Sequence, residues 1–494
     1  MRSKRWILLI ITFSLLLTAV FACGIWVWYD NNVDRSGWAE KNGVRFYRDF
    51  HAHPVSGWLE LEDGSYYFRD DGTPCLGWQE IDGSIYYFGG DGIMVTGWLR
   101  LEGKAYYLAE DGRRVSGWRT LDGRTHYFDS DGVMAEGWMQ LPGGRYYLPD
   151  GVLATGWQEI DAQRYHFADD GLMSIGFTEL DGSRYYFRED GVMLTGPAVI
   201  EDRRYLLLED GTMFTGWEES DSGRRYYLPE GPMAVGWTEI DGSRYYFRED
   251  GTPHTGWLRL GEYRYFLHRD GTAAVGPAKI DGQTHYFSPK GVEVILVNAL
   301  NPVPDFYEKE LVNVVDYHDV DARCYDALVR MLSDCSAAGI EYTFNSAYRT
   351  VEEQTAILEK RTLEHMENFE LDFEEAREKA LETVAIPGTS EHHLGLAVDL
   401  LGTEAVAWLQ EHCWEYGFIL RYTKEKEAIT GIIDEPWHFR YVGTEVSLDM
   451  KDSGLCLEEY LGAEAVTWEK VTALYGDKLY EQTEPQETQP SEAG

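Results

Sequence analysis

The chain has 494 residues, a length that suggests roughly two to four domains. Its 85 acidic and 44 basic residues give a formal net charge of -41, which repels nucleic acid and anionic lipid and excludes nucleic acid as a partner. Glycine, with 51 residues, and tyrosine, with 33, are abundant, which indicates internal repeats.

An apolar segment near the N-terminus predicts a membrane anchor. Arg2, Lys4 and Arg5 precede an uncharged run from Trp6 to Tyr29, which is long enough to cross a hydrocarbon core. The positive-inside rule leaves the N-terminus in the cytoplasm and the rest of the chain outside. A cleaved signal peptide is the alternative, but its apolar region is normally shorter. We therefore expect residues 1–29 to be a cytoplasmic start and an uncleaved single-pass transmembrane helix.

Residues 30–291 repeat with a period of 20, apart from one interval of 19. Gly-Trp pairs mark the period, and Phe177, Pro197 and Pro277 replace the tryptophan in three units. Two Asp-Gly turns flank an aromatic segment in each unit, which predicts a β-hairpin. One hairpin cannot bury its aromatic face but stacked hairpins can, so we expect a β-hairpin solenoid of about thirteen units. The candidate binding aromatics are Trp58, Trp78, Trp98, Trp118, Trp138, Trp157, Trp217, Trp237 and Trp257.

These units resemble the cell-wall-binding repeats of Gram-positive surface proteins, including choline-binding modules. The resemblance implies that rings from adjacent repeats form a cage for a quaternary ammonium group on teichoic acid, held by cation–π attraction. The family usually has a Trp-Tyr-Tyr step, whereas here the first aromatic is mostly replaced, as by Arg244 before Tyr245. A wall polymer is thus an expected partner, and its ligand group stays open. The alternative is that the rings only form the stacking core.

A second domain is predicted over residues 292–465, with α+β character. Asp321 can cap a helix that ends at Gly339, and a strand follows at 341–345. Further helices are expected at 351–360, 373–384 and 404–416, the last closed by a glycine, and a strand at 437–442. Residues 466–494 are expected to be a C-terminal extension with a disordered tail rich in Glu, Gln, Pro and Ser.

The six cysteines contain no Cys-x-x-Cys pair, which argues against a structural zinc knuckle. Cys324 and Cys335 share one face of the predicted helix, about 16 Å apart and too far for a disulfide with each other. Buried thiols are expected there. A bridge from either to Cys413 or Cys456 is compatible with an extracellular location and stays open.

Alternate residues of a strand face opposite ways. On the strand at 437–442, Trp437, Phe439 and Tyr441 are expected to face a core, which leaves His438 and Arg440 toward a cleft. By the same rule His392 and His393 point apart, so only one of them can bind an ion.

His392, Asp399 and His438 can therefore converge on one ion, and two imidazoles with a carboxylate suit Zn2+. Three protein ligands leave the fourth position open for water. Glu435 is expected to be the base that takes the proton of this water. Arg349 is the candidate for stabilising the oxyanion that develops on the attacked carbonyl.

Three motifs carry a family resemblance: Ser390-x-His392-x-x-Gly395-x-Ala397-x-Asp399, Glu435-x-Trp437-His438 and Ser346-Ala347-Tyr348-Arg349. Residues 296–443 resemble the VanY-type D-alanyl-D-alanine carboxypeptidases, a zinc peptidase family, with Ala347 in place of a glycine. The resemblance implies metal ligands His392, Asp399 and His438, the base Glu435 and the transition-state residue Arg349. It also implies that Ser390 and Gln354 help to hold the peptide and its terminal carboxylate.

The implied reaction is removal of the C-terminal D-alanine from a peptidoglycan stem peptide by an enzyme at the cell membrane, with its bulk in a Gram-positive-type wall. The chain has no Ser-x-x-Lys tetrad, so a serine mechanism has no support. Two alternatives stay open. One is an L,D-carboxypeptidase of the same fold, and the other is a non-catalytic wall-binding surface protein.

Overall fold

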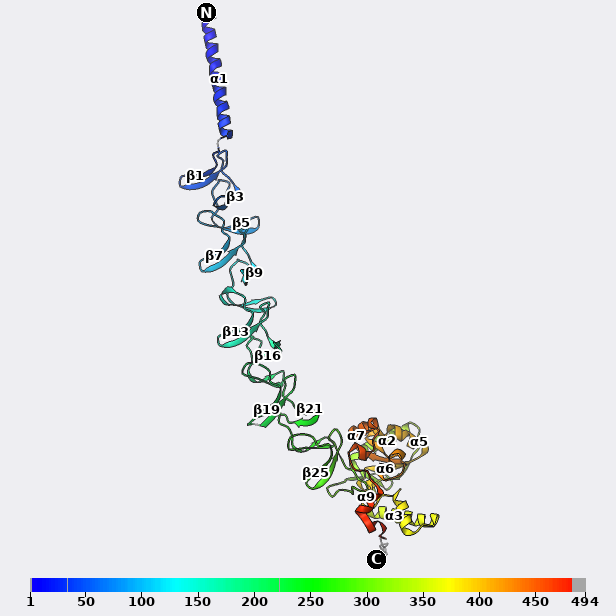
Figure 1. The fold of residues 1–494 in the computed structure, drawn as a ribbon. Helices are drawn as coiled ribbons and strands as arrows, with labels where there is room; N and C mark the ends of the chain where they lie inside the picture. The colour runs from blue at the N-terminus through cyan, green and yellow to red at the C-terminus, as the bar shows by residue number, and fades with distance from the viewer. Residues whose placement is uncertain (1, 33, 222, 482–494) are drawn as a thin grey trace, which may run out of the picture. The chain divides into compact units, whose positions relative to one another are not determined.

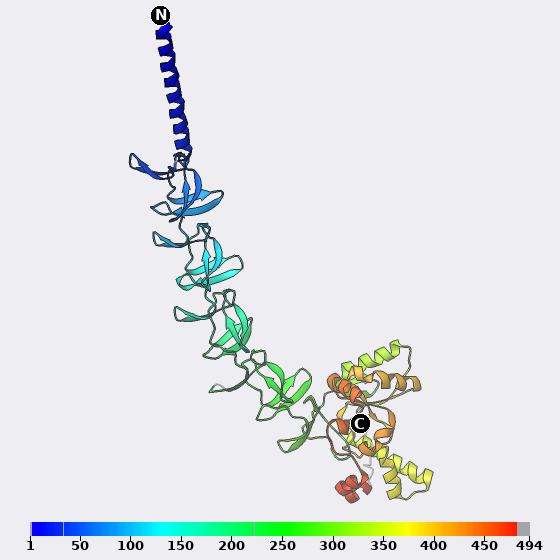
Figure 2. The ribbon, with the colours of Figure 1, turned by 45° about the horizontal axis from the view of Figure 1, so that its top comes forward.

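The structure is a computed structural model that describes residues 2–32, 34–221 and 223–481 (Figure 1). The chain divides into two compact units, residues 1–214 and 215–494. The expected fold class is confirmed: an N-terminal helix, a series of β-hairpins and a C-terminal α+β domain. Within each unit the hairpins are arranged one after another in chain order, as the two views show (Figure 1 and Figure 2). The disorder expected for the tail concerns residues 482–494, which lie outside the described residues.

Helix α1 (Arg2–Asn32) contains the apolar run expected from the sequence. Its segment Ile10–Trp28 is long and apolar enough to cross a membrane. A signal sequence near the N-terminus can meet the same criteria of length and composition.

Thirteen hairpins follow within the described residues, as expected. In the first unit the strands are β1 (Gly37–Lys41), β2 (Val44–Arg48), β3 (Gly57–Leu61), β4 (Gly64–Phe68), β5 (Gly77–Ile81), β6 (Ser84–Phe88), β7 (Gly97–Leu101), β8 (Lys104–Leu108), β9 (Gly117–Leu121), β10 (Arg124–Phe128), β11 (Gly137–Leu141), β12 (Gly144–Leu148), β13 (Gly156–Ile160), β14 (Gln163–Phe167), β15 (Gly176–Leu180), β16 (Ser183–Phe187), β17 (Gly196–Ile200) and β18 (Arg203–Leu207). In the second unit they are β19 (Gly216–Ser220), β20 (Gly223–Tyr227), β21 (Gly236–Ile240), β22 (Ser243–Phe247), β23 (Gly256–Leu260), β24 (Tyr263–Leu267), β25 (Gly276–Ile280) and β26 (Gln283–Phe287).

The hairpin β21–β22 shows how the sequence specifies each unit. Asp241 and Gly242 form its turn with φ values of +51° and +75°, the left-handed pair that a two-residue hairpin turn requires. Trp237 lies opposite Tyr246 across the strands, with ring centroids 5.3 Å apart. Trp237 also contacts Tyr265 of the next hairpin at 4.8 Å, so neighbouring hairpins are stacked through their rings.

The repeat interval of 19 residues before Trp157 is accommodated by a shorter loop between two hairpins. The connection after β12 is a short 3-10 turn (Pro149–Gly151) in which Asp150 has φ +50°. After it, the amide of Leu153 donates to the carbonyl of Thr125, the same type of bond between hairpins that other units make. One residue is therefore lost without a change in strand pairing.

The rest of the second unit surrounds a four-stranded antiparallel sheet of order β30-β31-β33-β32. Its elements are β27 (Glu293–Val294), β28 (Leu311–Val315), β29 (His318–Asp321), α2 (Ala322–Ala337), β30 (Thr343–Ser346), α3 (Val351–Phe369), α4 (Phe373–Leu381), η2 (Glu391–Leu394), β31 (Ala397–Leu401), α5 (Thr403–His412), η3 (Cys413–Tyr416), β32 (Phe418–Tyr422), η4 (Lys424–Lys426), α6 (Glu427–Thr430), β33 (Glu435–Tyr441), α7 (Thr444–Ser453), α8 (Leu457–Tyr460), α9 (Trp468–Tyr475) and η5 (Gly476–Tyr480).

Three expected helices differ from the observed ones, and the one expected at 373–384 is α4, which already ends at Leu381. Helix α3 begins at the expected residue, where Thr350 and Glu353 form a capping box, but it continues to Phe369. The helix expected at 404–416 is α5 followed by the 3-10 turn η3, and Gly417 ends it with φ +83°. A Cβ at Gly417 would lie 2.8 Å from the Tyr441 ring, so the chain also needs glycine there for close packing.

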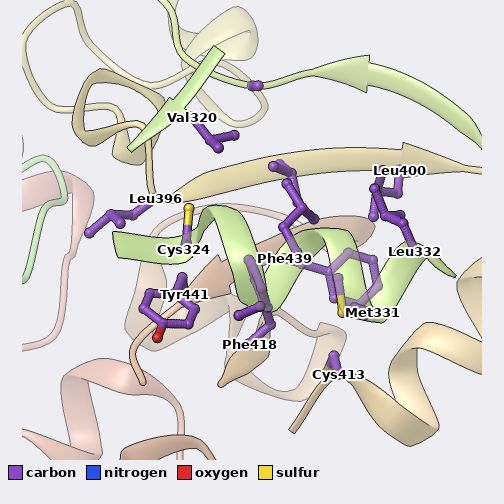
Figure 3. Close-up of a cluster of buried hydrophobic side chains, with 14 of the residues drawn as sticks. Val320, Cys324, Met331, Leu332, Leu396, Leu400, Cys413, Phe418, Phe439 and Tyr441 are labelled. Atoms are coloured by element: carbon purple, nitrogen blue, oxygen red, sulfur yellow. The ribbon is translucent and has the colours of Figure 1, made fainter. Parts of the chain in front are cut away.

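The main core lies between α2 and the sheet (Figure 3). The buried face of α2 includes Cys324, Met331 and Cys335, and it packs with side chains such as Phe418 and Phe439. All six cysteines are free, and no disulfide links the described residues. Five of the thiols are buried, and Cys23 in α1 is exposed. The possible bridges to Cys413 or Cys456 are not formed.

The last two hairpins pack on the α+β domain. Tyr265 and Leu267 of β24 share a buried apolar cluster with residues such as Leu457. Polar contacts cross the same boundary, because the Tyr441 hydroxyl donates to Glu262 at 3.0 Å. The α+β domain thus uses side chains that precede residue 292.

Candidate metal centre

Strand pairing brings two of the expected ligands together. Asp399 of β31 pairs directly with His438 of β33. His392 arrives from the short turn η2, whose N-cap Ser390 accepts from the His392 amide at 3.3 Å. Gly395 ends that turn with φ +72° and leads the chain back into β31.

The three side chains form a compact, buried set of donors. One ligand atom from each of His392, Asp399 and His438 lies within 4.8 Å of the others. Asp399 carboxylate oxygens lie 3.3 Å from His392 Nε2 and 3.1 Å from His438 Nδ1. Two imidazole nitrogens and a carboxylate oxygen at this spacing fit the ligand set of a catalytic zinc ion.

The second nitrogen of each imidazole has its own partner. His392 Nδ1 donates to the Ala347 carbonyl at 2.6 Å, and His438 Nε2 donates to Glu391 Oε2 at 3.4 Å. These contacts fix both tautomers and leave His392 Nε2 and His438 Nδ1 free to act as ligands.

Glu391 belongs to a buried charge network that sequence reasoning missed. Its carboxylate accepts from Arg421 at 2.9 Å and from Arg440 at 2.8 Å. Arg421 also donates twice to Glu458, which accepts a further bond from Asn298. All four charged side chains are almost fully buried. The available signal was the occurrence of charged residues inside otherwise apolar segments.

Glu435 lies beside the ligands. Its carboxylate is 3.8 Å from His438 Nδ1. Burial raises the pKa of Glu435 to about 7, against the opposing effect of His438. Burial would lower the pKa of His438, but its hydrogen bonds to the carboxylates of Asp399 and Glu391 outweigh this effect and raise the pKa to about 9. A carboxyl group with a pKa near neutrality suits proton transfer.

Arg349 lies on the other side of Asp399. Its guanidinium donates to Asp399 at 2.9 Å, to Gln354 Oε1 at 2.9 Å and to Ser346 Oγ at 2.8 Å. Gln354 is buried, and its amide nitrogen donates to the Ala385 carbonyl. Gln354 therefore contacts Arg349 and the backbone directly, and its position favours a role in orienting Arg349.

The neighbouring histidine has a different environment. His393 Nδ1 donates to the Arg349 carbonyl at 2.8 Å, and its Nε2 accepts from the Gly388 amide at 3.1 Å. Both ring nitrogens are used, so His393 holds the loop around the site.

Two orientations on β33 differ from the expectation. Trp437 was expected to face the core, but it is 36% exposed because it lies beyond the last pair with β31 and at an irregularity in the pairing with β32. Arg440 was expected to face a cleft, but it is 1% exposed and bonds to Glu391. A strand in the middle of a covered sheet buries both of its faces.

A cavity of about 450 Å³ lies on the side of Tyr422, and none of the three ligands, Glu435 or Arg349 lines it. Thr389 and Tyr422 line it, and the Tyr422 ring centroid is 5.0 Å from that of His438. Glu378, Glu382 and Glu427 also line the cavity, so its walls are apolar with several carboxylates.

The candidate aromatics of the repeats all lie between hairpins. Each of the nine tryptophans contacts a ring of the next hairpin at centroid distances from 4.8 to 5.4 Å. Phe177 makes the same contact with Tyr205, whereas Pro197 and Pro277 have no aromatic ring. The stacking role is thus met at every tryptophan.

A buried His-Asp-His set with a carboxylate beside it is an arrangement that suits a catalytic zinc ion. Residues 317–444 match the family model described as D-alanyl-D-alanine carboxypeptidase, VanY. The repeats match choline-binding repeat models at 76–114, 115–151 and 154–193, and a cell wall binding repeat at 235–252. The chain belongs to the VanY D-alanyl-D-alanine carboxypeptidase family, combined with choline-binding-type repeats.

Individual relatives agree with this placement. A D-alanyl-D-alanine carboxypeptidase of Enterococcus faecalis is 40% identical over 178 residues, which are 35% of this chain and 66% of that protein, just under two thirds of its length. The bifunctional D-Ala-D-Ala dipeptidase and carboxypeptidase VanXYC of Enterococcus gallinarum is 31% identical, over 33% of this chain and 91% of that protein. The solved structure of a vancomycin resistance D,D-pentapeptidase VanY with Zn(II) is 40% identical and covers 34% of this chain and 97% of that one, with a TM-score of 0.33.

Proposed function

We propose that the α+β domain is a zinc carboxypeptidase that removes the C-terminal D-alanine from peptidoglycan stem peptides. The observation that carries the proposal is the convergence of His392, Asp399 and His438, with Glu435 at 3.8 Å from the last of them. The relatives that share this domain are named for the same activity. Zinc is the metal that best suits two imidazoles and one carboxylate with an open position.

His392, Asp399 and His438 would hold the zinc ion, which would supply Lewis-acid chemistry for the attacking water and the scissile carbonyl. Glu435 accepts the proton of the attacking water, and its raised pKa allows it to pass that proton on to the leaving amino group of D-alanine. Arg349 presents its positive charge beside the centre, where it can stabilise the negative charge that develops on the carbonyl oxygen.

The cavity beside Tyr422 is the proposed location for the rest of the stem peptide. Tyr422 lines it and contacts His438 with a ring-centroid distance of 5.0 Å, and the cavity of about 450 Å³ is large enough for a few residues. Its carboxylates Glu378, Glu382 and Glu427 favour a peptide with a free amino group on a side chain. Ser390 and Gln354 support the site by holding His392 and Arg349 in place.

The test is hydrolysis of defined stem peptides by the purified chain loaded with zinc. Release of D-alanine from a pentapeptide, abolished by a chelator and by Glu435→Gln but insensitive to penicillin, is the expected result. Tetrapeptide stems in parallel reactions distinguish D,D- from L,D-cleavage. Full activity of Glu435→Gln would remove the assigned base, and inhibition by penicillin would remove the mechanism.

We also propose that the repeats dock the enzyme on the cell wall and that α1 anchors it in the membrane, with the bulk of the chain outside. The apolar segment Ile10–Trp28 and the matches to wall-binding repeats support this location. Fractionation of cells that express the full chain should find it in the membrane. Recovery of a shortened chain in the medium would instead indicate a cleaved signal.

A further inference from the structure

Most ring faces in the repeats are already covered by an arginine of the same chain. In seven hairpins a guanidinium carbon lies 3.5 to 4.6 Å from the centroid of the ring that follows the first glycine. The pairs are Arg45–Trp38, Arg145–Trp138, Arg164–Trp157, Arg184–Phe177, Arg224–Trp217, Arg244–Trp237 and Arg264–Trp257.

Strand register explains why this contact recurs. In β13–β14, Trp157 pairs with His166 and Glu159 pairs with Arg164. Arg164 is therefore the diagonal neighbour of Trp157 on the same face of the hairpin, within reach for a long side chain. The ring attracts the guanidinium by cation–π interaction, so each arginine fills the face that an external cation would need.

Four hairpins carry a different residue at this diagonal position. Ser65, Ile85, Ala105 and Thr125 stand there in β4, β6, β8 and β10. Within the described residues, Trp58, Trp98 and Trp118 have no cation over the ring, and Trp78 has only Arg114 at 5.9 Å. These hairpins are consecutive, so the uncovered rings form one segment of the solenoid.

Of these four tryptophans, only two are strongly exposed. Trp58 is 42% exposed and Trp98 is 44% exposed, whereas the tryptophans of the other described hairpins are less exposed. Trp58 is held from behind by Tyr67 at 5.2 Å and Tyr86 at 4.9 Å. Trp98 has the corresponding support from its own and the next hairpin. Each indole therefore contacts a ring of its own hairpin and one of the next hairpin, and much of the residue remains exposed.

We infer that ligand binding by the repeats is confined to the hairpins β3–β4 and β7–β8, at Trp58 and Trp98, and that the ligand is an organic ammonium group. The chain itself shows which chemistry these rings accept, because equivalent rings hold a guanidinium in seven other hairpins. The strongly acidic chain, with a net charge of -41, also favours a cationic ligand. The inference rests on the proposed wall docking and narrows it to two sites.

The test uses the full chain in a non-ionic detergent, since phosphocholine detergents carry the ligand group themselves. Equilibrium dialysis with choline should give two equivalents per chain. Ser65→Arg and Ala105→Arg place an arginine at the diagonal position, so each should remove one equivalent, and the double variant should bind none. Ser65→Ala is the matched control and should keep both. Conversely, Arg145→Ser should open a third site at Trp138.

D-alanine methyl ester, a primary ammonium compound, forms a second arm that separates a primary from a quaternary ammonium ligand. Two equivalents retained in the Ser65→Arg, Ala105→Arg double variant would overturn the inference. So would saturable binding of N-acetylglucosamine at Trp58 with no binding of either ammonium compound. Unchanged thermal unfolding of the variants establishes that they fold. Release of D-alanine from a soluble pentapeptide should be the same in all of them, so failure of the docking sites and failure of the enzymatic proposal are distinguishable.

Discussion

The buried network behind the metal centre allows a quantitative prediction for Glu458→Gln. Arg421 donates two charge-assisted hydrogen bonds to Glu458, at 2.9 and 2.5 Å, and both side chains have no solvent exposure. The glutamine loses the negative charge and cannot accept both bonds in the same way. Breaking a buried pair by removing one partner costs about 3–5 kcal/mol, so we expect a loss of that size in the free energy of unfolding.

A double variant separates the pair from its surroundings. Arg421→Met with Glu458→Leu removes one positive and one negative charge, and Glu391 keeps its contact with Arg440. The double variant should lose about 2 kcal/mol less in the free energy of unfolding than the sum of the losses in Arg421→Met and Glu458→Leu alone, because it leaves neither charge buried without its partner.

Hydrogen exchange at the amides of β32 and β33 is the suitable assay, because it reports the opening of the α+β domain separately from the repeats. A loss below about 1 kcal/mol for Glu458→Gln, or strictly additive effects in the double variant, would refute the reasoning that the two charges depend on each other.

The remaining predictions concern other parts of the second unit. Glu391→Gln should weaken zinc binding by about 10–100-fold in a competition titration with a chromophoric chelator, since it changes the acceptor of His438 Nε2, and unchanged affinity would contradict that role. Gly417→Ala should lower the melting temperature, because its Cβ would lie 2.8 Å from the Tyr441 ring at φ +83°; an unchanged melting curve would argue against that packing. A chain that starts at residue 256 should be more stable than one that starts at 292, because the last two hairpins cover a shared apolar cluster, and equal stability would show that the cluster contributes little.

The sequence predicted the features that depend on local patterns. The period of 20 and the turns were sufficient for the hairpins, because a two-residue turn specifies each one and a pair of facing aromatic rings supports most of them. The α2 helix followed from its Asp321 cap and from the spacing of its apolar residues. The motifs predicted that His392, Asp399 and His438 lie together, as they do in the structure, where strand pairing places Asp399 beside His438.

Features that depend on distant contacts could not be predicted. The burial of Arg440 and the exposure of Trp437 depend on which strands flank β33, and alternation along one strand contains no such information. The role of Glu391 is also invisible from spacing, because its partners Arg421 and Glu458 come from elements far along the chain. The arginines over the ring faces were visible as residues, but their diagonal register required the paired strands.

The short turn at residues 149–151 has an evolutionary consequence. A residue was lost there while the hairpins on either side kept their own pairing. Since each hairpin carries its own ladder, recombination can duplicate or delete copies at a glycine–tryptophan boundary without inventing new side-chain complementarity. The exception is the final pair of hairpins, which pack on the α+β domain and therefore cannot be exchanged independently of it.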